Sequence, residues 1–293
     1  MKPVYSSASN LIIDKAISSK TLKTTLSCKD LLEVLERMTK LDALAEEKIK
    51  SYNNKMGCSA ILGILFLPIA LLSTQAYLIG SLISILGYVL IIGAIIYFRK
   101  VQARYRSQNF ANEYREQVIP FLEGLHNHIS ESSKVDIKMQ LATTENEPFK
   151  YESKDVELSS ETILEVRSYY RPYLELNIEL KDGNQLSIAG SEHIIRQRRI
   201  PSISSRQSDL RLKIRYEKKA KLEFSLQLSC SPIYRLKRDS SESMHDCQIE
   251  TDNEDRPVIL TSKIELKDSP DPEEIVVSLL KATDRFYKCI AKE

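Results

Sequence analysis

The feature that most constrains this chain is one long stretch without charge. From Met56 to Phe98 the sequence holds no Asp, Glu, Lys or Arg, although charged residues make up 28% of the chain. A helix that crosses a bilayer needs about 20 apolar residues, and the stretch is long enough for two such helices. We therefore expect a two-helix transmembrane hairpin, with spans at residues 56–73 and 76–98 joined by a short polar turn.

Positive charge flanks this stretch on both sides, whereas the expected turn carries none. The flanking residues are Lys48, Lys50 and Lys55 before it and Arg99, Lys100, Arg104 and Arg106 after it. Segments that stay in the cytoplasm carry an excess of Lys and Arg. The pattern predicts a multi-pass membrane protein with both termini in the cytoplasm, and it makes the lipid bilayer the first expected partner.

Small residues recur along both predicted spans. They are Ser59 and Gly63 in the first span, and Ser73, Gly80, Gly87 and Ala94 at intervals of seven along the second. Small side chains let helices approach closely in lipid, where no hydrophobic force drives them together. We expect these residues to pack the hairpin, and a homo-oligomer formed through the same residues is the alternative.

Amphipathic segments flank the uncharged stretch. Residues 27–55 begin with a capping-box pattern at Ser27 and Asp30, and apolar residues follow at helical spacing in both 27–55 and 99–130. We expect two cytoplasmic helices that form an antiparallel, coiled-coil stalk, with self-association of the stalk as the alternative. Residues 1–26 are rich in Ser, Thr and Lys, and we expect them to be mobile, with a short ordered piece around Leu11–Ile17.

The remaining residues, 131–293, show the alternation of a β-rich domain. Apolar residues recur at every second position in several runs, and Asp182-Gly183 separates two of them as a hairpin turn would. An acidic linker at 239–256 precedes a last strand. Asp271, Pro272 and two glutamates then start an amphipathic helix over 271–290. The predicted fold class is α+β, with an antiparallel barrel or sandwich closed by one helix, in the element order of pleckstrin-homology domains.

One part of this domain resembles a known group of proteins. The runs Arg171–Leu176, Leu180–Leu186 and Arg196–Arg199 resemble a stretch of uncharacterised bacterial membrane proteins of unknown function. Those proteins have a tryptophan near the first position, and this chain has none. The resemblance implies a bacterial inner-membrane protein and brings no activity with it.

Basic residues gather in the second half of the β-rich domain. Residues 194–238 hold thirteen Lys and Arg against three acidic residues. The candidate anion-binding residues are Arg196, Arg198, Arg199, Arg211, Lys213 and Arg215. The plain interpretation is a solvated strand face. The functional one is attraction to anionic lipid headgroups, and nucleic acid is a second polyanion, although no aromatic residues are interleaved to stack its bases.

Catalytic chemistry has little support in the sequence. No nucleophile, phosphate-loop or zinc-protease motif occurs, and His126 and His128 stand two apart, so they point to different sides of a helix. The five scattered cysteines read as free thiols. We expect no catalytic residue, no metal and no cofactor. The expected function is a membrane-anchored cytoplasmic binding or scaffold protein, and the alternative is a tethered sensor or effector that recognises a nucleotide or nucleic acid.

Overall fold

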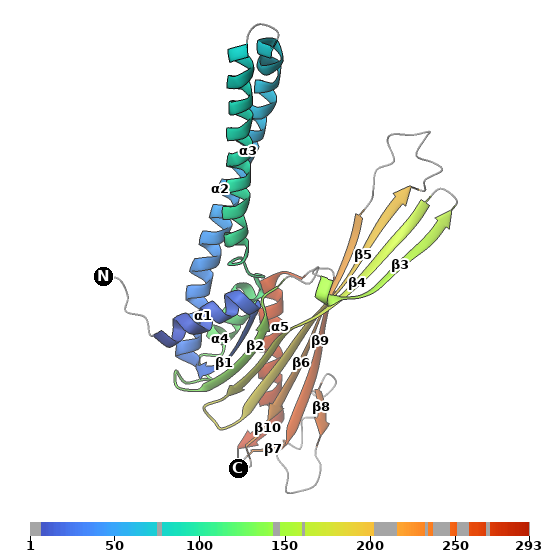
Figure 1. Ribbon diagram of the computed structural model, residues 1–293. Coiled ribbons are helices and arrows are strands. Elements are labelled where there is room, and N and C mark those ends of the chain that lie inside the picture. Colours follow the sequence, from blue (N-terminus) through green and yellow to red (C-terminus); the bar gives the residue numbers. More distant parts are fainter. Residues whose placement is uncertain are drawn as a thin grey trace. The chain divides into compact units, whose positions relative to one another are not determined.

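The computed structural model is shown in Figure 1. It describes residues 7–74, 78–142, 147–159, 162–201, 216–231, 234–236, 247–250, 258–267 and 270–292. The chain divides into two compact units. The helical unit is Arg37–Phe110, and the β unit combines Met1–Glu36 with Ala111–Glu293.

Two long helices make up the helical unit. They are α2 (Cys28–Thr74), whose first residues belong to the β unit, and α3 (Leu78–Arg106). An aromatic contact joins them, because the Tyr52 ring lies 5.9 Å from Phe98 and 6.1 Å from Tyr105. Close by, Gln102 Nε2 donates to Asn53 Oδ1 at 2.6 Å. Polar and aromatic side chains therefore contribute to the contact between the described parts of these two helices.

The predicted two-helix transmembrane hairpin is wrong. Within the described residues one segment, Leu86–Arg106, is long and apolar enough to cross a membrane, by length and composition alone. The other predicted span is no separate element, because α2 is a single helix of 47 residues whose first half is charged. We also predicted a multi-pass protein of a bacterial inner membrane with both termini in the cytoplasm. That prediction depended on the hairpin and is wrong as well.

The coiled-coil stalk is wrong as well, since the described residues contain no coiled coil. The helix after the uncharged stretch ends at Arg106 instead of continuing to residue 130. The chain then forms a π-helix, η1 (Tyr114–Val118), and the short α4 (Ile119–Gly124). Both belong to the β unit, where Tyr114, Val118 and Phe121 are buried. The apolar residues at helical spacing that predicted one half of a stalk are therefore residues that pack in the core of the β unit.

The β unit is built on an open antiparallel sheet. Its eight described strands are β1 (Thr21–Ser27), β2 (Lys134–Gln140), β3 (Lys150–Ser159), β4 (Thr162–Glu179), β5 (Gln185–Pro201), β6 (Tyr216–Ser229), β8 (Cys247–Glu250) and β9 (Ile259–Lys267). The order is β1-β2-β4-β5-β6-β9-β8, and β3 pairs with one half of β4. The α+β class and the antiparallel pairing are as expected, but the described strands of this sheet form a single open layer instead of the predicted barrel or sandwich of pleckstrin-homology type.

Further short elements complete the β unit. They are α1 (Ser7–Ser19), the 3-10 turn η2 (Glu147–Phe149), β7 (Tyr234–Leu236), α5 (Pro272–Cys289) and β10 (Ile290–Lys292), with β7 and β10 paired in a small second sheet. The N-terminal segment that we expected to be mobile instead forms α1 and β1 from Ser7 onward. The polar composition of this segment gave no sign of a strand. Backbone pairing with β2 along the whole length of β1 stabilises it instead.

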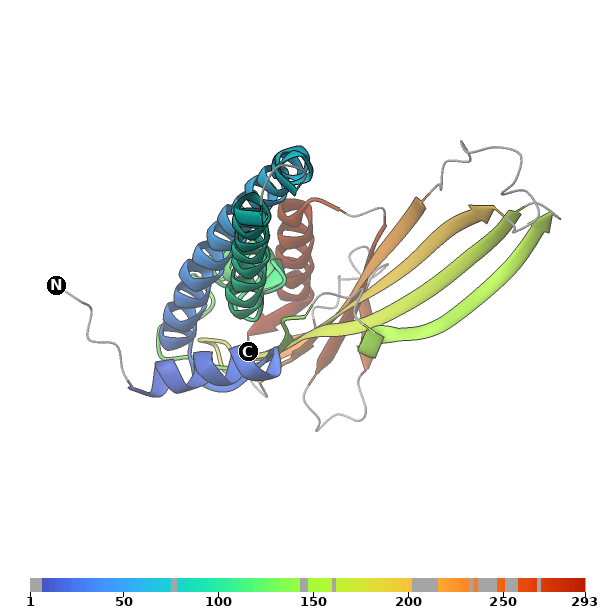
Figure 2. The same cartoon turned by 45° about the horizontal axis from the view of Figure 1, so that its top comes forward.

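Helices cover one face of the sheet. Figures 1 and 2 show α4 and α5 on the same side, and α5 contacts β6 and β9. Buried side chains recur at every second position along the central strands, and Leu176 on β4 lies directly opposite Ile188 on β5. The predicted start of α5 is correct, because Asp271 Oδ1 accepts a hydrogen bond from Glu273 N at 3.2 Å. This layer is the core of the β unit.

A glycine in the middle of β5 makes room for the aromatic part of this core. A Cβ at Gly190 would lie 3.0 Å from Phe224 Cε1 and 3.3 Å from Tyr173 Cζ. The two rings meet edge to face with their centroids 6.1 Å apart. Contacts this short leave no space for a methyl group unless the rings move.

We expect Gly190→Ala to lower the free energy of unfolding by about 1–3 kcal/mol, the usual cost of overpacking a core. Urea denaturation monitored by tyrosine fluorescence would measure it. Ala189→Ser is the matched control, because Ala189 is exposed on the opposite face of the same strand, and it should change stability by less than about 0.5 kcal/mol. Equal effects of the two substitutions would contradict the packing described.

Candidate functional site

Three arginines and one glutamate form a compact group on the paired strands β4 and β5. Arg167 lies directly opposite Arg196, and Glu165 lies directly opposite Arg198. Positions two apart on a strand point to the same face, so all four side chains share one face of the sheet. They line a cavity of about 180 Å³. We call Arg167, Arg196 and Arg198 the arginine cluster.

Glu165 is the acidic residue of this cavity. Its carboxylate accepts from Arg167 Nε at 2.6 Å and also contacts Arg167 Nη2, and Arg198 Nη1 lies 3.8 Å away. The hydrogen bond to Glu165 raises the pKa of the Arg167 guanidinium above its already high ordinary value. Among the residues that line the cavity, three cations meet one anion. The arrangement can therefore accept a further anion.

The arginine side chains of this cluster remain partly accessible to solvent. The side chains of Arg167 and Arg198 are each 39% exposed, whereas that of Glu165 is 14% exposed. Arginine presents a planar fork of donors that matches the oxygens of a phosphate or carboxylate. Two like charges directly opposite each other on neighbouring strands repel. The geometry of Arg167 and Arg196 is thus suited to an anion that binds between strands.

The sequence anticipated part of this site. Arg196 and Arg198 are two of the predicted anion-binding residues, and the structure brings them together. Arg199 lies on β5, but its side chain is outside the described part. Arg211, Lys213 and Arg215, with the strand predicted to carry them, lie outside the described residues. Glu165 and Arg167 were missed, because only the register of β4 against β5 shows that they lie opposite Arg198 and Arg196.

The small residues of the helical unit are partly at a helix contact. Ser59, Gly63, Gly87 and Ala94 are half-buried. A Cβ at Gly63 would lie 3.6 Å from Ile91 Cγ2, and Tyr88 Oη donates to Gly63 O at 3.5 Å. Gly63 thus faces α3. The side chains of Ser73 and Gly80 are outside the described part.

A buried polar group lies on the same face of the sheet as the arginine cluster. Arg171, whose side chain is 1% exposed, pairs with Glu192 at 3.2 Å on the neighbouring strand and contacts Glu113 at the start of η1. It also donates to Ala142 O, the second residue beyond β2. Nearby, Tyr173 Oη donates to Gln117 Oε1 at 2.9 Å. Arg171 thereby links β4, β5, η1 and the chain after β2.

Other chemistry-bearing side chains are held in structural contacts. His126 Nδ1 lies 3.1 Å from Glu123 O, and the His128 ring stacks on Tyr287 at 5.0 Å. Within the described ranges no three His, Cys, Asp or Glu side chains are placed to hold a metal ion. Cys230 is a buried free thiol, and burial raises its pKa to about 11. At neutral pH that sulfur is almost wholly protonated, which makes it a poor nucleophile.

We expect Arg171→Met to destabilise the β unit by about 3–5 kcal/mol, because it leaves two carboxylates largely buried without their counter-charge. The triple variant Arg171→Met, Glu113→Gln, Glu192→Gln should recover part of that loss. Thermal and urea denaturation followed by circular dichroism would measure both.

Lys138→Met is the control for loss of an exposed ion pair. Lys138 Nζ lies 2.7 Å from Glu175 Oε1, and each side chain is 52% exposed, so this substitution should cost at most about 1 kcal/mol. If Arg171→Met cost no more than this control, the buried group would not be important to stability.

Comparison of the chain with protein-family models, with curated proteins and with solved structures finds no match.

Proposed function

We propose that this protein is a membrane-attached binding protein whose arginine cluster binds anionic lipid headgroups. The observation that carries the proposal is the cavity in which three guanidinium groups meet a single carboxylate. Lipid phosphates offer the oxygen geometry that arginine forks bind in pairs. Each cation near an anionic surface contributes about 1 kcal/mol to association. The cluster can therefore supply a headgroup preference of up to about 3 kcal/mol.

The helical unit supports attachment to a bilayer. The segment Leu86–Arg106 is only 6% buried, so it is not a core helix of this chain. Its large apolar side chains are exposed, including Leu86, Val89, Leu90, Ile92 and Ile96 at 54–65%. An exposed apolar surface of this kind marks a site that contacts a membrane or another protein. Tyr97, which is 60% exposed and stands two residues before Arg99, is of the residue type that is enriched at membrane interfaces.

Recognition of a nucleotide or nucleic acid is less well supported by the same site. The side chains that line the cavity are Glu165, Arg167, Arg196 and Arg198. None of them is aromatic, and sequence-independent binding of bases relies on aromatic rings for stacking. A phosphate is thus better matched by this lining than a base. Nucleotide binding remains an outcome that the experiment below can detect.

We expect the full-length protein to bind vesicles that contain phosphatidylserine about 10- to 100-fold more tightly than phosphatidylcholine vesicles at 0.1 M salt. The variant Arg167→Gln, Arg196→Gln, Arg198→Gln should lose that preference yet still bind phosphatidylcholine. The preference of the wild type should fade towards 1 M salt, where the Debye length falls to about 3 Å. Co-flotation at a series of salt concentrations measures all three.

The matched control is Lys23→Gln, Lys134→Gln, Lys263→Gln, which removes the same charge from exposed positions on β1, β2 and β9. It should retain most of the preference. If the two triple variants lost the preference for phosphatidylserine to the same extent, the preference would depend on net charge alone. That result would contradict a binding site at the arginine cluster. Binding of ATP that is lost in the arginine variant, together with no preference between vesicles, would instead favour the nucleotide alternative.

Attachment through the apolar segment is tested separately. We expect Leu90→Lys to weaken flotation with phosphatidylcholine vesicles by roughly 100-fold, because a lysine in the centre of a bilayer-inserted helix costs about 2.5–3.5 kcal/mol. Glu47→Lys adds a lysine to an exposed position in the polar part of α2 and should leave flotation unchanged. If the Leu90→Lys protein floated as well as the wild type, the segment Leu86–Arg106 would not be inserted in the bilayer.

A further inference from the structure

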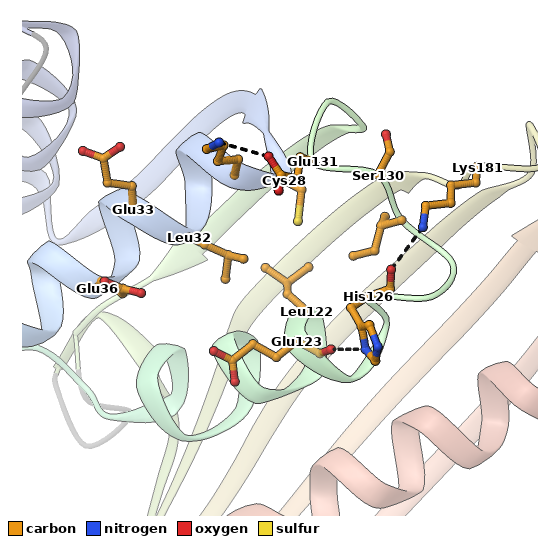
Figure 3. A pocket seen from close by; sticks show the side chains of 12 residues that line it. Cys28, Leu32, Glu33, Glu36, Leu122, Glu123, His126, Ser130, Glu131 and Lys181 are labelled. Carbon is orange, nitrogen blue, oxygen red and sulfur yellow. Dashed lines mark hydrogen bonds and ion pairs between the residues drawn. The ribbon is translucent and has the colours of Figure 1, made fainter.

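A second surface of the β unit is an open groove of about 840 Å³. Figure 3 shows it between the first turns of α2 and the short helix α4, with the loop that follows α4 and Lys181 at one end. Its apolar lining comes from Leu32, Leu122 and Ile129. Leu122 and Ile129 are buried, while Leu32 is half-buried and points from α2 towards α4 in Figure 3. The groove is separate from the arginine cluster, with which it shares no residue.

Hydrogen bonds that involve the backbone fix the walls of this groove. Ser27 Oγ accepts from Asp30 N at 3.1 Å and so caps the start of α2. Cys28 N donates to Ser133 O at 2.9 Å, which ties the same turn to the chain just before β2. At the far end Lys181 N donates to His128 O at 2.9 Å. A groove held this way is preformed, so a ligand would not have to order it.

The rim of the groove is acidic. Glu33, Glu36 and Glu123 are exposed, and none of the described residues forms an ion pair with them. The basic residues of the lining are already engaged, since Lys29 pairs with Glu131 at 3.0 Å and Lys181 Nζ donates to two backbone carbonyls at 3.3 Å. The carboxylates flank the apolar lining on both sides, from α2 and from α4. Charge complementarity therefore calls for a cationic occupant with an apolar face.

We propose that this groove binds a basic amphipathic helix of a partner protein. An apolar centre with charged residues at the rim is the layout of a protein interface. A small-molecule site would instead have polar groups converging on its floor. Glu33 and Glu36 stand three residues apart on α2, so they match Lys or Arg at helical spacing along the partner. Apolar anchors of that helix then contact Leu32, the mode in which helices lie in grooves.

This inference does not depend on the proposed membrane function, and its test uses the full-length chain in non-ionic detergent. The probe is a synthetic helical peptide of about five turns, with Leu on one face and Lys on its flanks. We expect binding in the micromolar range. Glu33→Gln, Glu36→Gln, Glu123→Gln should weaken it about ten-fold or more, since three ion pairs are lost. Leu32→Asn should weaken it as well, because it removes the apolar contact and leaves the charge unchanged.

Matched controls separate a site from general attraction between charges. The variant Glu47→Gln, Asp155→Asn, Glu179→Gln loses the same charge at exposed positions elsewhere, and its affinity should stay within about two-fold. Circular dichroism melts establish that each variant is folded. The proposal is overturned if the peptide does not bind at about 1 mM, if a peptide with Glu in place of Lys binds equally well, or if both triple variants behave alike. A dimer of this chain that the groove variant abolishes would show that the occupant is a second copy, which also overturns it.

Discussion

One buried guanidinium group holds together the elements around the middle of the sheet. Arg171 contacts carboxylates from β5 and from the start of η1, and it donates to the backbone beyond β2. A buried charge is costly to desolvate, so it persists only where partners surround it. Its Nε and Glu113 Oε2 nevertheless lack a hydrogen-bond partner among the described residues. The π-helix, a rare form that is frequent at functional sites, lies where Glu113 contacts this group and Gln117 accepts a hydrogen bond from the neighbouring Tyr173.

The same face of β4 changes character on either side of this group. Towards the end of the strand, Leu176 and Ile178 are buried in the core that the helices cover. Towards its start, the side chain of Arg167 is 39% exposed and that of Glu165 is 14% exposed. Figure 1 shows the reason, because β3, β4 and β5 extend past the part of the sheet that α5 covers. The arginine cluster is thus a continuation of the core face into a region that no described helix covers.

The sequence predicted what depends on local pattern and missed what depends on distant pairing. The turn at Gly183, which has a positive φ of 81°, and the capped start of α5 at Asp271 follow from nearby residues. By contrast, Arg171 meets Glu113 across 58 positions, a contact that no spacing reveals. The strands β1 and β3 are polar, and pairing with β2 and β4 supplies what their composition does not. Candidate anion-binding residues were found from charge, but Arg167 emerged only with the register of β4.

Local imbalance of charge, rather than net charge, distinguishes the two surfaces of the β unit. The chain as a whole carries a net charge of +2, so it is not short of either sign. The cavity of the arginine cluster is nevertheless lined by one carboxylate for three cations, and the rim of the groove has three carboxylates that no described residue pairs. Like charges held together oppose folding slightly. A partner that neutralises them binds only the folded chain, and such binding adds RT ln(1 + [L]/Kd) to its stability. If the two proposals hold, a ligand at either surface would add to the stability of the folded chain in this way.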